Sequence, residues 1–164
     1  MKNKYLFSSL LLTSLILAAL VLSPMDLPAP DVTFKTIYGK KIELKKLKGK
    51  PVIVTFWATD CASCIKEISH LIDLYKEFHP QGLEIIAVAM YYDPPNHVVN
   101  MSKAKQIPYE IALDLTAQHA FAFNQVELIP ATFLISPKGN IIMQNTGLFD
   151  MPDMKQQIEN LITG

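Results

Sequence analysis

Two spacings of apolar residues alternate along this chain and predict the order of its strands and helices. Near-continuous apolar runs at 52–56 and 83–90 are typical of strands that are buried on both faces. Between them, apolar side chains recur every three or four residues from Ile65 to Phe78, which predicts a helix with one apolar face. A strand, a helix and a second buried strand make a βαβ unit, so we expect parallel strands with a right-handed crossover.

Shorter elements are expected on both sides of this unit. Turn residues around Gly39 and along 136–140 separate short apolar segments and indicate hairpins. The remaining elements are expected, in chain order, to be strands at 32–34 and 41–44, a helical turn at 44–47, a helix at 96–105, an extended segment at 109–113, a helix at 116–123, strands at 131–135 and 141–144, and a helix at 154–162. This order predicts an α/β fold, with a central mixed β-sheet flanked by helices and an N-terminal β-hairpin extension.

The N-terminal region predicts a membrane anchor. Two early lysines, Lys2 and Lys4, precede a stretch without charges that continues to Met25. As a helix, residues 5–22 would span about 27 Å, close to the ~30 Å core of a bilayer. The lysines place the amino end in the cytoplasm and the domain outside. The alternative is a cleaved signal peptide, although Pro24 would hinder cleavage after the preceding small residue.

Length and charge limit the other possibilities. The 164 residues leave room for one domain, and we divide the chain into an anchor or signal segment (1–24), a Pro-rich linker (25–31) and the domain (32–164). Fifteen basic side chains balance 15 acidic ones, so no electrostatic attraction favours nucleic acid. We expect a monomer without a nucleic-acid partner.

The chain has only two cysteines, Cys61 and Cys64, and they stand between a predicted strand and a predicted helix. The first turn of a helix offers unpaired N–H groups and the positive end of the helix dipole, which favour a thiolate at Cys61. Cys64, three residues later, falls on the same helical face. The spacing predicts a dithiol/disulfide switch, in which Cys61 attacks and Cys64 resolves.

Other uses of two cysteines fit the sequence poorly. A zinc site lacks a second cysteine pair or a close histidine pair, because the four histidines are widely spaced. Haem attachment requires a histidine directly after Cys64, where Ile65 stands. Two inert core thiols would not need this spacing at a strand-to-helix junction. We therefore expect no metal and no cofactor besides the Cys61–Cys64 disulfide itself.

Several features together resemble the thioredoxin superfamily. They are Trp57 four residues before Cys61, the βαβ frame, and the segment 129–135 before a hairpin. More narrowly, the chain from about residue 30 onward resembles the membrane-anchored TlpA/ResA-like thiol-disulfide oxidoreductases. The resemblance implies a thioredoxin-like fold.

The resemblance also implies roles for individual residues. Pro130 matches the family's cis-proline, which presents the preceding backbone, at Ile129, to an extended substrate. Glu67 matches a glutamate that exchanges protons with the second cysteine, although an acid in the first helical turn, favoured by the dipole, would also stand there. Trp57 is interpreted as a wall of the substrate groove, with a core aromatic as the alternative.

Two departures from the family pattern, at residues 62–63 and at Asp60, favour a reductant, and a third concerns the buried acid. Thr55 stands where thioredoxin has a buried aspartate, so Glu67 is the nearest replacement. No proline or positive group lies between the cysteines, at Ala62 and Ser63, to stabilise a Cys61 thiolate strongly. Asp60 either opposes thiolate formation or caps the helix.

The sequence therefore predicts an extracytoplasmic protein-disulfide reductase of the bacterial inner membrane or periplasm. The resemblance implies clients such as apocytochromes c and a membrane thiol carrier that supplies electrons. A thiol peroxidase would need a proline and a threonine where Val54 and Ala58 stand. Two alternatives stay open: a thioredoxin-like copper chaperone that also uses His119, and an oxidase or isomerase that runs the same exchange in reverse.

Overall fold

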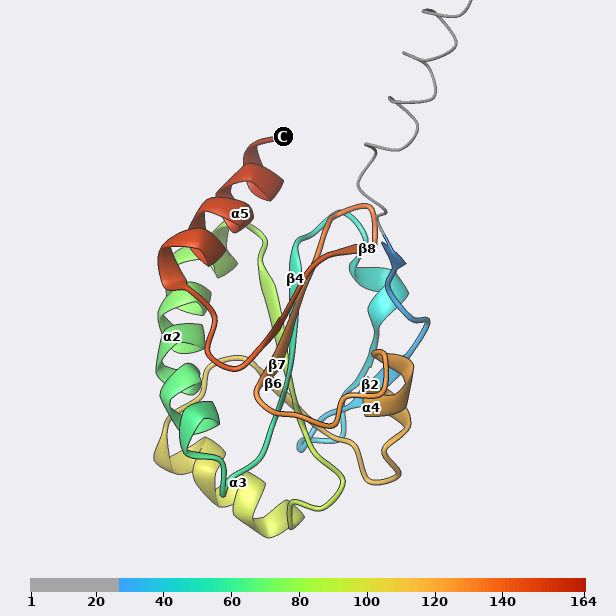
Figure 1. Ribbon diagram of the computed structural model, residues 1–164, viewed down its shortest axis with the longest axis vertical. Coiled ribbons are helices and arrows are strands. Elements are labelled where there is room, and N and C mark those ends of the chain that lie inside the picture. The colour runs from blue at the N-terminus through green and yellow to red at the C-terminus, as the bar shows by residue number, and fades with distance from the viewer. Residues whose placement is uncertain (1–26) are drawn as a thin grey trace, which may run out of the picture.

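A six-stranded mixed sheet forms the centre of the protein in the computed structural model, which describes residues 27–164 (Figure 1). The strand order is β1-β8-β7-β4-β5-β6. The bounds are β1 (Leu27–Pro28), β4 (Val52–Trp57), β5 (Glu84–Ala89), β6 (Glu110–Leu113), β7 (Ala131–Ile135) and β8 (Asn140–Thr146). β4 pairs in parallel with β5 and antiparallel with β7, which confirms the expected βαβ unit and the mixed sheet.

Helices and a small hairpin cover the two faces of this sheet (Figure 1). One face carries α2 (Ala62–Phe78), α3 (Pro95–Ala104) and α5 (Met151–Thr163). The other carries α4 (Gln118–Ala122) and the two-stranded sheet of β2 (Thr33–Lys35) and β3 (Lys41–Glu43), followed by the 3₁₀ turn η1 (Leu44–Leu47). A second 3₁₀ turn, η2 (His79–Gln81), follows α2.

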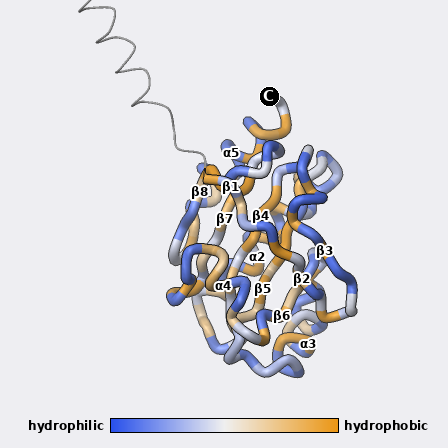
Figure 2. Tube along the Cα trace, turned by 90° about the vertical axis from the view of Figure 1, so that its right-hand side faces the viewer, coloured by the Kyte–Doolittle hydropathy of each residue, from blue (hydrophilic) through white to orange (hydrophobic). Residues whose placement is uncertain are grey.

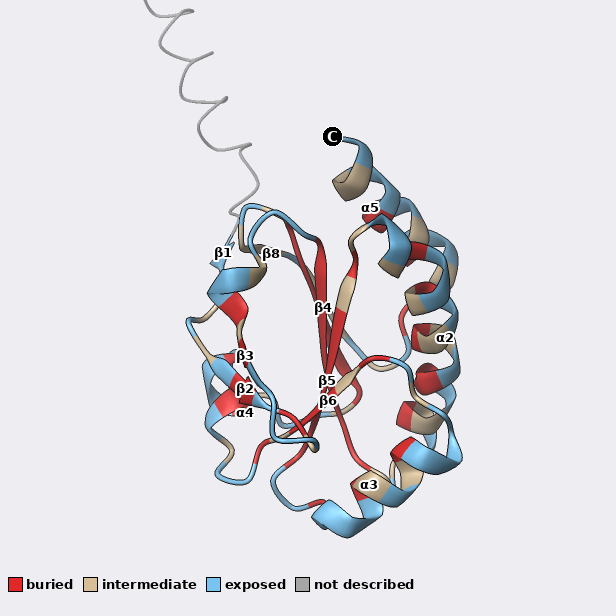
Figure 3. Ribbon diagram, turned by 180° about the vertical axis from the view of Figure 1, so that it is seen from behind, coloured by how far each residue is buried: buried red, intermediate tan, exposed pale blue. Residues whose placement is uncertain are grey.

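Each face of the sheet has its own hydrophobic core. All six residues of β4 are buried and alternate between the faces, so that Ile53 and Trp57 pack toward α2 while Val54 and Phe56 pack toward the hairpin. Figure 2 shows hydrophobic residues gathered along the central strands, and Figure 3 shows the buried residues of α2 on the side turned to the sheet. On the hairpin side, Phe133 makes edge-on contacts with the rings of Phe56 and Phe123.

Two helices begin two or more residues away from their expected starts. α4 is shorter, because Ala117 takes a left-handed conformation (φ 59°) and the Asp114 carboxylate accepts hydrogen bonds from the N–H groups of His119 and Ala120. α5 starts three residues earlier than expected, because Asp150 caps it by accepting a hydrogen bond from the N–H of Asp153. In both cases, an aspartate side chain sets the start.

The sheet also begins earlier than the sequence indicates. Leu27 and Pro28, assigned to the linker, form β1 and pair with Ile141 and Asn140 of β8. A proline is compatible with an edge strand, because it lacks only one ladder donor. The linker of residues 25–31 is therefore partly a strand.

The predicted anchor, residues 1–24, lies outside the described residues. Across residues 27–164, no helix combines the length and the apolar character that crossing a bilayer requires.

Truncating Phe133 is expected to destabilise the fold strongly. Its side chain is fully buried, so Phe133→Ala leaves a cavity and lowers the free energy of unfolding by about 3–5 kcal/mol. Phe121→Ala is the matched control, because Phe121 is 70% exposed and its loss changes stability by less than about 0.5 kcal/mol. Urea unfolding followed by the fluorescence of the single tryptophan measures both, and equal effects would contradict the described packing.

Candidate active site

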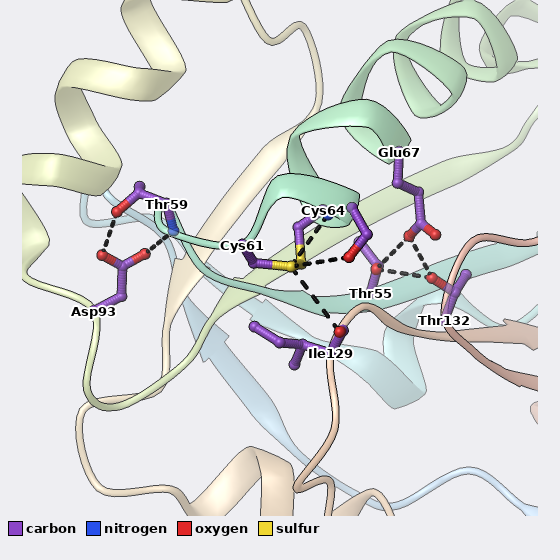
Figure 4. The surroundings of a disulfide bond; sticks show 9 residues. Thr55, Thr59, Cys61, Cys64, Glu67, Asp93, Ile129 and Thr132 are labelled. Atoms are coloured by element: carbon purple, nitrogen blue, oxygen red, sulfur yellow. Dashed lines mark hydrogen bonds between the residues drawn. A yellow bond between two sulfur atoms is a disulfide. The ribbon is translucent and has the colours of Figure 1, made fainter.

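Cys61 and Cys64 form a disulfide at the junction of β4 and α2, with an S–S distance of 2.07 Å and a Cα–Cα distance of 5.2 Å (Figure 4). Cys61 is itself the N-cap of α2, and its sulfur accepts a hydrogen bond from the N–H of Cys64 at 3.1 Å. Cys61 is partly exposed, whereas Cys64 is 1% exposed. The accessible sulfur is thus the one expected to attack, and the buried sulfur is the one expected to resolve.

The groups around the Cys61 sulfur would stabilise a thiolate moderately. The N–H of Cys64 points at this sulfur, and the hydroxyl oxygen of Ser63 lies 3.4 Å from it. Asp60 is exposed and does not cap α2, so the capping alternative for Asp60 is wrong. Ser63 is a contact that sequence reasoning missed, because nothing but its place between the cysteines marks it.

The backbone at Ile129 lies beside the disulfide, as the family resemblance implies. The peptide bond between Ile129 and Pro130 is cis, and the Ile129 carbonyl oxygen lies 4.0 Å from the Cys61 sulfur. The Pro130 carbonyl accepts a hydrogen bond from the N–H of Gly147 at 2.8 Å, which holds this turn against the loop after β8. A fixed backbone segment therefore borders the accessible sulfur.

Glu67 lies on α2 one helical turn after Cys64, is 1% exposed, and belongs to the buried face of the helix. Its Oε1 lies within hydrogen-bonding distance of the hydroxyl oxygens of Thr132 (2.7 Å) and Thr55 (3.1 Å), as Figure 4 shows. Burial raises the pKa of Glu67, while hydrogen bonds donated to the carboxylate, that of the Thr132 hydroxyl first, act in the opposite direction. The alternative of an acid in the first helical turn is wrong, because Glu67 stands beyond that turn and is buried.

Only one oxygen of this carboxyl group has partners. Among the described residues, Oε2 of Glu67 is buried without a hydrogen bond. The N–H of Phe149 lowers the pKa of the carboxyl group but forms no hydrogen bond of normal geometry with Oε2. A buried, half-satisfied carboxyl group one helical turn after a resolving cysteine is the arrangement expected of a proton acceptor.

The expectation that Trp57 forms a wall of the substrate groove is wrong. Trp57 is 2% exposed and belongs to the core cluster that also contains Cys64 and Ile68. The alternation of β4 turns this ring toward α2, so the core aromatic is the correct interpretation.

A clamp between Asp93 and Thr59 holds the loop before Cys61. Asp93 is buried, and its two carboxylate oxygens accept hydrogen bonds from the N–H and the hydroxyl of Thr59, each at 2.7 Å (Figure 4). Beside the clamp, Tyr91 and Tyr92 are exposed, with ring centroids 5.2 Å apart. Because β5 runs parallel to β4, the residues that follow β5 lie at the same edge of the sheet as Cys61, but no local sequence pattern indicated the clamp.

The histidine considered for a copper site lies on the other face of the sheet. His119 packs against Phe34, with ring centroids 4.9 Å apart, in the core opposite the one that contains Cys64. Within residues 27–164, no three His, Cys, Asp or Glu side chains are grouped so that they could hold a metal ion.

Comparisons with known proteins show which family the chain belongs to. The model of the AhpC/TSA family matches residues 25–144. The thiol-disulfide oxidoreductase ResA of Bacillus subtilis is 39% identical over 109 residues, which cover 66% of this chain and 60% of that protein. ResA of one Bacillus cereus strain is 33% identical over 124 residues, covering 76% of this chain and 68% of its own length. The match thus spans less than two thirds of the B. subtilis protein.

Solved structures of related proteins share the fold of this chain. A thiol:disulfide interchange protein of the thioredoxin family from Chlorobium tepidum has a TM-score of 0.77 at 27% identity, covering 85% of this chain and 99% of that one. StoA from Bacillus subtilis has a TM-score of 0.67 at 25% identity, covering 79% and 98%. The expected thioredoxin-like fold is confirmed. Because the family model covers most of the chain and the two ResA proteins are 39% and 33% identical to it, the chain belongs to the AhpC/TSA family and to the ResA-like thiol-disulfide oxidoreductases.

Proposed function

We propose that this protein reduces disulfides of client proteins outside the cytoplasm, through dithiol exchange at Cys61 and Cys64. The observation that carries the proposal is the difference between the two sulfurs: Cys61 is accessible at the start of α2, and Cys64 lies buried within bonding distance. The Cys61 sulfur can reach a client, whereas the Cys64 sulfur can reach only the Cys61 sulfur. This arrangement suits a two-step exchange in which the client leaves fully reduced.

The reaction begins with the reduced protein. The Cys61 thiolate attacks one sulfur of the client disulfide, the client S–S bond breaks, and the other client sulfur leaves as a thiolate that takes a proton from water. A mixed disulfide now joins Cys61 to the client. The Cys64 thiol then gives its proton to Glu67, and its thiolate attacks the Cys61 sulfur. The Cys61–Cys64 bond forms as the second client thiolate leaves, so two electrons have passed to the client.

The direction of electron flow follows from how weakly the Cys61 thiolate is stabilised. A strong oxidant stabilises its reduced form through an acidic thiol. Here the described donors to the Cys61 sulfur are one N–H and one hydroxyl, without a positive side chain, and Asp60 stands next to it in the chain. This supports reduction of clients over the reverse reaction of an oxidase or isomerase.

The partners and the location complete the proposal. The relatives' shared name, thiol-disulfide oxidoreductase, supports exchange with protein disulfides; we propose apocytochromes c and other extracytoplasmic thiol proteins as clients. A reductase in an oxidising compartment needs a membrane thiol carrier to restore its dithiol. The N-terminal segment would hold the domain at the outer side of the inner membrane, where it acts as a monomer without another cofactor.

Removing the resolving cysteine should trap clients. In Cys64→Ala, the mixed disulfide at Cys61 has no internal route to resolution, so covalent client adducts accumulate. Cys61→Ala is the matched control, because Cys64 is buried and should form few adducts. Non-reducing electrophoresis with mass spectrometry detects the adducts. Equal yields from both variants, or none from either, would exclude the proposed exchange.

The reduction potential should lie near that of thioredoxin, about −270 mV. Titration of the wild-type protein in glutathione or dithiothreitol buffers, read by thiol alkylation, gives the value. Cys64→Ala serves as the control, since it cannot form the internal disulfide. A potential near about −120 mV would instead indicate an oxidase.

Neutralising Glu67 should slow the resolution step. Loss of a positioned proton acceptor lowers the rate on the order of a hundredfold at pH 7. Because burial raises the pKa of Glu67, the wild-type rate should increase with pH through a range above that of an ordinary glutamate, and Glu67→Gln should lack this increase. Stopped-flow decay of a preformed mixed disulfide measures it. Glu77→Gln, on the exposed side of α2, should behave like wild type; a normal Glu67→Gln profile would remove Glu67 from the mechanism.

A further inference from the structure

Three buried oxygen atoms beneath α2 form a closed triangle. They belong to Thr55 of β4, Thr132 of β7 and Glu67 of α2, and their separations are 2.7 Å (Thr132–Glu67), 2.8 Å (Thr55–Thr132) and 3.1 Å (Thr55–Glu67). Thr55 and Thr132 face each other directly in the antiparallel register of β4 and β7. All three residues are almost completely buried, so the hydrogens that serve these contacts come from the three side chains themselves.

The number of hydrogens in the triangle depends on the charge of Glu67. Each threonine hydroxyl carries one hydrogen, and an ionised carboxylate carries none. With Glu67 ionised, two hydrogens must serve three contacts, so one pair of oxygens faces each other without a hydrogen in a site shielded from water. A proton on Oε1 supplies the third hydrogen. Each oxygen then donates once and accepts once, and the ring is complete.

The distances indicate which contact lacks a hydrogen. Bonds to a charged acceptor are short, and the shortest side of the triangle joins Thr132 to Glu67, so the Thr132 hydroxyl donates to the carboxylate. The next side is 2.8 Å, where the Thr55 hydroxyl donates to Thr132. The longest side, between Thr55 and Glu67, is the one that a proton on Oε1 would fill. Oε2 offers no such place, because it has no acceptor within the described part of the chain.

We infer that Thr55 and Thr132 are positioning residues that act on Glu67 in opposite directions. Thr132 stabilises the ionised carboxylate by donating to it, and Thr55 stabilises the neutral acid by accepting its proton. Together they direct the proton that leaves Cys64 to Oε1. When the disulfide is reduced again, Cys64 leaves as a thiolate and takes this proton back, so the proton cycles between one sulfur and one oxygen. The role in catalysis rests on the proposed function, but the ring itself does not.

Few other ionisable groups face the triangle. Cys64 does not titrate while it is in the disulfide. Burial and the charge of Glu67 raise the pKa of the Tyr109 hydroxyl above the range of the experiment. His70 lies farther along α2 and packs edge-on against the Phe149 ring, with 6.0 Å between centroids. In the oxidised protein, Glu67 therefore titrates without a coupled thiol.

The test is the pKa of Glu67 in the oxidised full-length protein, read from the carboxyl C=O stretch in infrared titrations. Glu67→Gln identifies the band by removing it. Thr132→Val should raise the pKa and Thr55→Val should lower it, each by about one pH unit, the effect of one hydrogen bond. Added apolar surface alone would raise the pKa in both variants, so a fall in Thr55→Val has no trivial cause. Thr55→Ser and Thr132→Ser retain the hydroxyls and should match wild type.

A rise in both valine variants, or no change in Thr55→Val, would overturn the ring, because both hydroxyls would then act as simple donors or not at all. If a valine variant fails to fold, the corresponding alanine variant is expected to shift the pKa in the same direction. The outcome is independent of client exchange. Opposite shifts without trapped clients in Cys64→Ala would retain the ring and reject the reductase; trapped clients with shifts of equal sign would do the reverse.

Discussion

The pairing of β4 on both sides, with β5 and with β7, is the constraint on which the rest of the structure depends. It buries every residue of the strand and assigns alternate side chains to two different cores. It also fixes the point where the strand ends, and therefore where α2 begins. Since Cys61 is the cap of that helix, the reactive sulfur is positioned by the sheet rather than by a free loop, and two hydrogen bonds between Thr59 and Asp93 hold the connection.

The same strand creates the polar pocket beneath the resolving cysteine. Thr55 is the one polar side chain of β4, and it stands on the face where α2 packs. A hydrophobic residue there would leave the Glu67 carboxyl group with one partner fewer in a dry environment, which is unfavourable for a buried polar group. The acid and the threonine therefore form one unit. The helix supplies the carboxyl group that gains and loses a proton, and the sheet supplies hydroxyls that can form hydrogen bonds with either form.

The long periodic elements could be predicted from the sequence because their own residues determine them. β4, α2 and β5 lie within a few residues of their expected positions, and the cysteine pair and the proline at 130 stand as the family pattern implies. Contacts between distant segments could not be predicted: Thr132 is 77 positions from Thr55, and β1 is too short to show a period. The prediction for Trp57 was wrong because a strand buried on both faces has no alternation of apolar and polar residues. Its sequence therefore does not indicate which face Trp57 points to.

The position of β1 bears on how far the reactive sulfur can reach. Residue 27 joins the sheet next to the β7–β8 turn, at the end where β4 starts, whereas Cys61 follows the opposite end of β4 (Figure 1). Six residues of strand separate these ends by about 20 Å. If the proposed N-terminal anchor holds the chain at a membrane, attachment at residue 27 would leave the disulfide at the end of the domain turned away from the bilayer. Soluble clients would have unobstructed access there, while any electron donor embedded in the lipid would need its own protruding thiols to meet it.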